Sequence, residues 1–144
     1  MKNTADNLER FIRAQQSDYD IALREVRNGK KRSHWMWYVF PQMRGLGRSG
    51  TADYYGIDGL DEAEAYLDNP VLGPRLVEIS SALMDLETKD ATRIFGYPDV
   101  LKLRSCMTLF AVACKEENSV FRQVLDAYFH GEPDEQTLNL LKRA

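Results

Sequence analysis

Apolar residues recur at spacings of three and four along most of this chain, and this periodicity most constrains its fold. The clearest stripe would face a core along one side of a long helix, with Leu72, Leu76, Ile79, Leu83 and Leu86. A second stretch, residues 101–114, reads LKLRSCMTLFAVAC and is apolar on nearly every side. A helix of that composition must be surrounded by others, so we expect an all-α fold with 101–114 as its central helix.

Weaker helical patterns cover most of the remaining chain. We expect helices near residues 8–15, 18–28, 60–67, 119–129 and 134–141, with Ser17 or Asp18 starting the second of them. Glycines and one Asn-Pro pair separate these patterns, and neither a repeat nor a linker interrupts them. The 144 residues are a typical size for one domain, so residues 1–144 are predicted to form a single compact domain of about six to eight helices.

The aromatic segment HWMWYVF, residues 34–40, resists assignment by periodicity. Seven residues fit a strand or a short buried helix equally well. The helical patterns on either side favour a short helix or an irregular buried segment, ended by Pro41. A glycine-containing loop should follow over about residues 41–52. Long ordered loops in small domains often carry function.

Charge is distributed unevenly along the sequence. The net charge is −3, but residues 24–48 hold seven cations and one acid, Glu25, so this stretch carries +6 and the rest of the chain −9. That balance argues against a protein that binds duplex DNA with its whole surface. A local site for an anion fits it better.

The segment 30–55 contains the residue types that an anion or nucleotide site needs. Arginines can fork onto phosphate or carboxylate, hydroxyls and amides add hydrogen bonds, and aromatic rings stack on a planar group. The candidate ligand-binding residues here are Arg44, Arg48, Gln42, Ser49, Trp35, Trp37 and Tyr54. The structural alternative is that the aromatic residues fill a core and the glycines around the arginines only make turns.

Three further residues are candidates for chemistry. His34 titrates near neutrality and is the candidate general acid–base, although a single histidine more often serves as a structural hydrogen-bond donor. Cys106 would be a nucleophile beside it, but an apolar helix suppresses thiol reactivity. Arg104, inside the apolar stretch, either contacts a ligand or pairs with Asp99 or another carboxylate; pairing is favoured because an unpaired buried charge is costly.

The remaining patterns limit the cellular context. The two histidines and two cysteines lack the spacing of a zinc site, so we expect neither metal nor cofactor. Cys106 and Cys114, eight residues apart on a helix, are too far apart for a disulfide, which suits a reducing compartment. No apolar run reaches the length of a membrane span, and the N-terminus lacks a signal-peptide pattern. We therefore expect a soluble cytoplasmic protein.

Three long strings carry a family resemblance that covers the chain from about Leu8 to Leu141. They are KKRSHWMWYVFPQMRGLGRSGTADYYGI from residue 30, DEAEAYLDNPVLGPRL from residue 61, and IFGYPDVLKLRSCMTLF from residue 94. Together they resemble the uncharacterised family called domain of unknown function 1810. The resemblance implies a mainly helical domain. It brings no established activity and no functional residues.

Two functions remain in competition at the level of sequence. The first is a small-ligand-binding domain, possibly an enzyme, that recognises an anionic or nucleotide-like molecule at segment 30–55. The second is an interaction module without catalysis, which uses the basic residues to contact an acidic protein or RNA. The glycine-containing loop favours the first, because glycines allow a small molecule to approach the backbone closely.

Overall fold

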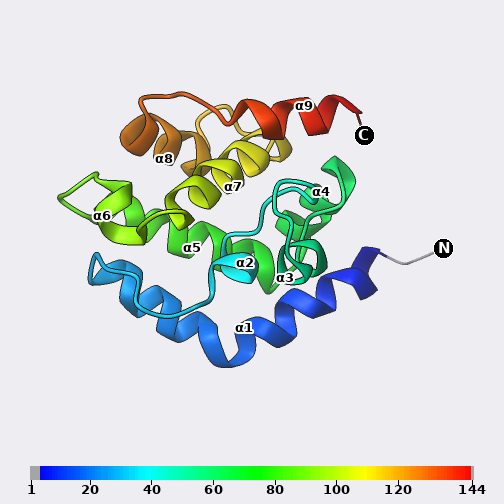
Figure 1. The fold of residues 1–144 in the computed structure, drawn as a ribbon, viewed down its shortest axis with the longest axis horizontal. Coiled ribbons are helices and arrows are strands. Elements are labelled where there is room, and N and C mark those ends of the chain that lie inside the picture. Colours follow the sequence, from blue (N-terminus) through cyan, green and yellow to red (C-terminus); the bar gives the residue numbers. More distant parts are fainter. Residues whose placement is uncertain (1–3, 144) are drawn as a thin grey trace.

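The computed structural model describes residues 4–143, and over this range the chain forms nine helices and no strand (Figure 1). The helices are α1 (Thr4–Arg27), α2 (Met36–Val39), α3 (Gly50–Tyr54), α4 (Leu60–Asp68), α5 (Leu72–Asp85), α6 (Ala91–Phe95), α7 (Asp99–Ala113), α8 (Val120–Phe129) and α9 (Glu135–Arg143). The predicted all-α fold is confirmed. The count exceeds six to eight in part because α3, with five residues too short to show a helical period, lies where only a glycine-containing loop was expected.

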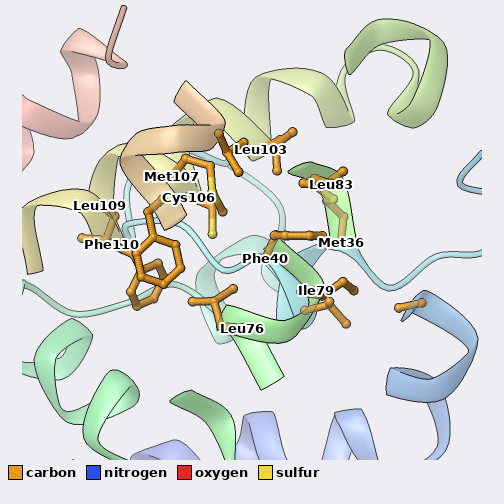
Figure 2. Close-up of a cluster of buried hydrophobic side chains, with 14 of the residues drawn as sticks. Met36, Phe40, Leu76, Ile79, Leu83, Leu103, Cys106, Met107, Leu109 and Phe110 are labelled. Atoms are coloured by element: carbon orange, nitrogen blue, oxygen red, sulfur yellow. The ribbon is translucent and has the colours of Figure 1, made fainter. Parts of the chain in front are cut away.

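Helix α7 is the centre of the fold, as its apolar sequence predicts. It packs against α4, α6, α8 and α9. Figure 2 shows its buried side chains Leu103, Cys106, Met107, Leu109 and Phe110 in one cluster with Leu76, Ile79 and Leu83 of α5. Met36 of α2 and Phe40 join this cluster. The aromatic segment 34–40 therefore contains a short helix, Met36–Val39, and contributes side chains to the core.

Helix α1 is one helix of 24 residues, where the sequence suggested two. The expected break at Ser17 and Asp18 does not occur, because neither residue stops a helix as glycine or proline does. Asp18 instead accepts a hydrogen bond from the Tyr38 hydroxyl and so links α1 to α2. The chain leaves α1 at Gly29, whose φ of +74° suits a residue without a Cβ.

The corner between α4 and α5 brings two stretches of backbone into close contact. A Cβ at Gly73 would lie 2.1 Å from the carbonyl oxygen of Leu67. Asn69 holds the turn, since its Oδ1 accepts hydrogen bonds from the backbone N–H groups of Val71 and Leu72 at 2.9 and 3.1 Å. This corner fixes the position of α4.

The glycine-containing stretch forms a closed loop, here called the 43–57 loop. Met43 and Ile57 pair as an isolated parallel bridge, in which Arg44 N–H donates to Ile57 O and Ile57 N–H to Gln42 O, both at 2.9 Å. Within the loop, α3 begins at Gly50. The 43–57 loop is therefore a compact loop with adjacent ends, of the type that often carries a site.

Candidate functional site

A pocket of about 830 Å³ lies between the N-terminal half of α1 and the 43–57 loop. Its lining is mostly charged and consists of Asn7, Glu9, Arg10, Arg13, Arg44, Asp53, Tyr54 and Asp58. Three guanidinium groups and three carboxylates thus surround one cavity. In Figure 1 the 43–57 loop and α3 lie beside the N-terminal half of α1. Helix α4 follows α3 along the chain.

Arg10 fastens the loop to the helices. Its side chain is only 10% exposed, and Nη2 lies 3.0 Å from Oε1 of the buried Glu62 on α4. The guanidinium also donates to the carbonyl oxygens of Tyr54, at 2.8 Å, and Gly56, at 2.9 Å. Glu62 in turn accepts the backbone N–H of Asp58 at 2.9 Å. One ion pair therefore joins α1, the end of the loop and α4.

Arg13 and Arg44 are held much more loosely than Arg10. Arg44 is 40% exposed, and its guanidinium lies 3.8 Å from Asp53 Oδ1 and 3.5 Å from Asp58 Oδ1. Arg13 is well exposed and lies 3.6 Å from Glu9. Exposed ion pairs with such distances contribute about 0–1 kcal/mol. Both cations can therefore change partners at little cost.

Tyr54 supplies an aromatic surface at the pocket. It is 58% exposed, and its ring packs edge-on against Tyr55, with 4.8 Å between centroids and an interplanar angle of 85°. Tyr55 is itself packed against Tyr38 and Phe11. The exposed ring therefore stands on a rigid aromatic base.

The pocket brings together only Arg44 and Tyr54 of the predicted ligand-binding residues. Arg48 is exposed and does not line the pocket. Ser49 is the N-cap of α3, where its Oγ accepts the backbone N–H of Ala52 at 3.0 Å. Gln42 is half-buried, and its carbonyl accepts the bridge hydrogen bond from Ile57.

The two tryptophans of the aromatic segment belong mainly to the packing of the protein. Trp35 is fully buried, and its indole N–H donates to Glu25 Oε1 at 2.9 Å, so its ring offers no surface to a ligand. Trp37 is half-buried, with the Lys102 ammonium 4.5 Å from its ring centroid. For Trp35 the structure therefore supports the alternative in which aromatic residues fill the core.

The cations of residues 24–32, here called the basic run, present less positive charge at the surface than the sequence suggests. Lys31 is nearly buried and pairs with Asp99 on α7, with 2.9 Å between Nζ and Oδ2. Burial by itself raises the pKa of Glu25. Hydrogen bonds from the Ser33 hydroxyl, the N–H groups of Arg32 and Ser33, and the Trp35 indole outweigh it and lower this pKa to about 2.

The candidates for catalysis lie apart from the pocket. His34 is exposed, and its carbonyl oxygen lies 3.2 Å from the Tyr38 hydroxyl oxygen. Cys106 lies in the core of α7, where burial raises the pKa of its thiol well above the ordinary value. No hydrogen bond joins Cys106 to His34 among residues 4–143.

Arg104 takes the alternative role that the sequence favoured, that of a paired cation. Its Nε donates to the carbonyl of Glu132 at 3.0 Å, and Nη2 lies 3.4 Å from the Glu132 carboxylate. Arg104 does not line the pocket. Asp99, the other partner considered, binds Lys31 and Lys102 instead.

Sequence reasoning missed most of the pocket. Asn7, Arg10 and Arg13 follow one another at intervals of three on α1, which places them on one face of the helix. That spacing was visible in the sequence, but nothing in it revealed that the face meets a loop some 40 residues away.

Within the described part of the chain, no group of three or more His, Cys, Asp or Glu side chains is arranged to hold a metal ion. Likewise, none of its helices combines the length and apolar character needed to cross a bilayer.

Comparison with known proteins places this arrangement in a family. Among solved structures, the chain is similar to the crystal structure of the conserved hypothetical protein Rv1873 from Mycobacterium tuberculosis, with 47% identity and a TM-score of 0.91. The match covers 94% of this chain and 96% of that chain. The comparison with curated proteins gives no match. The model of the family described as "Protein of unknown function (DUF1810)" matches residues 5–141, and the chain therefore belongs to that family.

Proposed function

We propose that the pocket between α1 and the 43–57 loop binds a small anionic molecule of the nucleotide type. The observation that carries this proposal is the meeting of three guanidinium groups, those of Arg10, Arg13 and Arg44, with an exposed tyrosine ring in one cavity. At about 830 Å³, the pocket falls within the usual range for small-ligand sites.

The arginines have different roles in this proposal. Arg10 has its guanidinium committed to Glu62 and to the backbone carbonyls of Asn7, Tyr54 and Gly56, so it sets the shape of the pocket. Arg13 and Arg44 have exposed ion-pair partners, and Arg44 Nε also donates to the Asp53 carbonyl at 3.2 Å; these two arginines bind the anion. Guanidinium groups suit phosphate because they donate two parallel hydrogen bonds.

The acidic residues narrow the class of ligand. Glu9, Asp53 and Asp58 line the same cavity, and a bare polyanion would be repelled by them. A molecule that also carries hydroxyl or amino groups would donate hydrogen bonds to these carboxylates. With Tyr54 available for stacking on a planar ring, a nucleoside phosphate satisfies all three kinds of lining group.

The test is a thermal-shift screen of nucleotides, ADP-ribose-type compounds and sugar phosphates, followed by calorimetry on any compound that stabilises the protein. The double variant Arg13→Gln/Arg44→Gln should lose at least tenfold in affinity, because it removes two charge-assisted contacts of about 1.5–3 kcal/mol each. The matched control, Arg48→Gln/Arg122→Gln, changes the net charge equally with two exposed arginines outside the pocket.

The aromatic contribution has its own control. Tyr54→Ala should weaken binding of nucleotides but not of inorganic phosphate, whereas Val112→Ala, at an exposed apolar side chain outside the pocket, should change neither. A ligand whose affinity survives Arg13→Gln/Arg44→Gln would show that the site lies elsewhere. A screen without any stabilising compound would refute the proposed class of ligand.

The second function that the sequence suggests, contact with RNA or an acidic protein, involves a different surface. The exposed cations of the basic run lie toward the C-terminal end of α1, well away from the pocket at residues 7–13.

A further inference from the structure

We propose that the C-terminal end of α1 and the chain that follows it bind a short single-stranded nucleic acid. The surface, here called the cationic end, consists of Arg24, Arg27, Lys30, Arg32 and the exposed ring of Tyr97. Residues 13 and 24 are about 16 Å apart along the axis of α1, since a helix rises 1.5 Å per residue. The cationic end is thus separate from the pocket.

The fold removes the one acid of this segment from its surface. Glu25 turns toward the 31–35 chain, where its carboxylate accepts hydrogen bonds from the backbone N–H groups of Arg32 and Ser33, the Ser33 hydroxyl and the Trp35 indole. All four bonds lie between 2.6 and 3.0 Å. The carboxylate stays ionised but is directed toward residues 32–35, and the four exposed cations of the segment outnumber it.

The four outward cations have no ion-pair partner among residues 4–143. Arg24, Arg27, Lys30 and Arg32 are all exposed, and none takes part in a salt bridge there. Lys31, by contrast, points inward to Asp99. Asp20, one turn before Arg24 on α1, is the nearest exposed acid along the helix, and no ion pair joins the two. The cations are therefore free for phosphates.

Tyr97 adds an exposed aromatic ring at the α6–α7 junction, the segment to which the chain after α1 is joined. Lys31 fastens the chain that follows α1 to the α6–α7 junction, because its backbone N–H donates to Ile94 O at 2.8 Å and its ammonium pairs with Asp99. Tyr97 lies between those two partners in sequence and is 78% exposed, the highest value among the exposed large hydrophobic residues. An aromatic ring this exposed gains nothing from the core of its own chain.

This combination favours a nucleic acid single strand over an acidic peptide or a duplex. An acidic peptide would pair with the cations but would make no specific contact with the Tyr97 ring, whereas unpaired bases stack on aromatic rings. A duplex hides its bases and extends over a longer surface, where the −9 carried by the rest of the chain repels it. Four cations and one ring match a strand of a few nucleotides.

The experiment is fluorescence anisotropy of a labelled 12-nucleotide oligouridylate over a series of KCl concentrations. Four phosphate contacts on a single strand predict that log K falls with log[KCl] with a slope of about −3. Affinity should drop at least tenfold, and the slope should approach zero, in the quadruple variant Arg24→Gln, Arg27→Gln, Lys30→Gln and Arg32→Gln. The matched control makes the same charge change at exposed cations elsewhere, namely Arg48, Lys115, Arg122 and Lys142.

Tyr97→Ala tests the platform separately. It should weaken oligouridylate binding at least about fivefold and leave the binding of an oligoglutamate of equal length unchanged. Thermal unfolding of each variant checks that it is folded. The Arg13→Gln/Arg44→Gln variant should bind oligouridylate normally, so this proposal stands or falls independently of the pocket.

Three outcomes would overturn the proposal. The first is no binding of oligouridylate at 50 mM KCl. The second is an equal loss of affinity in the matched control, which would show a non-specific charge effect. The third is oligoglutamate or duplex DNA binding at least as tightly, with no effect of Tyr97→Ala, which would assign the surface to an acidic protein partner or to duplex DNA.

Discussion

At the scale of single residues, Glu25 carries more of the local structure than any other charged side chain near the basic run. Its carboxylate organises residues 32–35 by accepting four hydrogen bonds, and it forms no salt bridge among residues 4–143. Carboxylates that accept several hydrogen bonds stay ionised at low pH. The low pKa of Glu25, about 2, is therefore a property of the folded loop.

Replacing Glu25 with Gln should destabilise the protein at neutral pH. The amide oxygen can keep the three N–H donors of Oε1, but the NH₂ group takes the place of Oε2 opposite the Ser33 hydroxyl, and all the bonds lose their charge assistance. The loss should therefore be about 2 kcal/mol in the free energy of unfolding. Urea denaturation at pH 7 measures it. Glu87→Gln, at an exposed glutamate, is the control and should change stability by less than about 0.5 kcal/mol.

The same carboxylate predicts a pH dependence. The folded pKa of about 2 lies below the ordinary value of 4.5, so the stabilisation is complete above pH 4.5 and is lost as the pH falls towards 2. The difference in unfolding free energy between wild type and Glu25→Gln should therefore shrink across this window. A difference that stays constant from pH 5 to pH 2.5 would contradict the role given to Glu25.

At the scale of elements, the 43–57 loop is held by close backbone contact as well as by its terminal bridge. A Cβ at Gly56 would lie 2.6 Å from Arg44 Cα and 2.7 Å from Arg44 Cβ. The two ends of the loop can pack this closely only because residue 56 has no side chain. Arg44 is thereby placed at the edge of the pocket.

Gly56→Ala should destabilise the protein by about 1–3 kcal/mol, the usual cost of overpacking against a rigid neighbour. It should also weaken ligand binding, because Arg44 must move. Gly50→Ala is the matched control: nothing lies within 4 Å of a Cβ there, and Gly50 begins α3, so the variant should be neutral or slightly stabilising. Urea unfolding measures the stability of both variants. Equal changes in the free energy of unfolding would show that the close contact is unimportant.

The sequence predicts elements well where they are long and amphipathic. The apolar stripe from Leu72 to Leu86 identified α5, and the composition of 101–114 identified α7. Short helices have too few residues to show a period, so α3 was not expected within the glycine-containing loop, and periodicity could not decide between strand and helix for the segment that contains α2. The false break at Ser17 has a similar cause: a residue typical of helix caps was accommodated inside α1 because the helix packs against α2, α4 and α5.

At the scale of the whole molecule, the position of α7 gives residues of the same type very different degrees of burial. Leu101 and Leu103 both stand in the apolar stretch, but Leu103 is fully buried while Leu101 is 49% exposed. Leu103→Ala should therefore cost about 2–5 kcal/mol, and Leu101→Ala less than about 0.5 kcal/mol. Similar losses for both variants in chemical denaturation would contradict the central position of α7.

The candidate site was only partly predictable, for a reason that also belongs to this scale. Arg44 and Tyr54 could be identified because they stand in an unusual local segment. Arg10 and Arg13 stand in an ordinary amphipathic helix, and their relevance comes from a contact between chain segments far apart in sequence. Trp35 shows the converse: its local setting suggested a ligand, but the fold places it in the core.

The bridge between Met43 and Ile57 closes the 43–57 loop at its base, so the tip of the loop can be changed without moving its ends. Its two ends meet through a pair of backbone hydrogen bonds, so residues added between Gly47 and Gly50 would lengthen only the tip. Lengthening a closed loop costs little entropy, about 0.6 kcal/mol for each doubling. Libraries that vary the tip in sequence and length should therefore be tolerated while the helical scaffold keeps its stability, which makes this fold a practical starting point for engineered receptors.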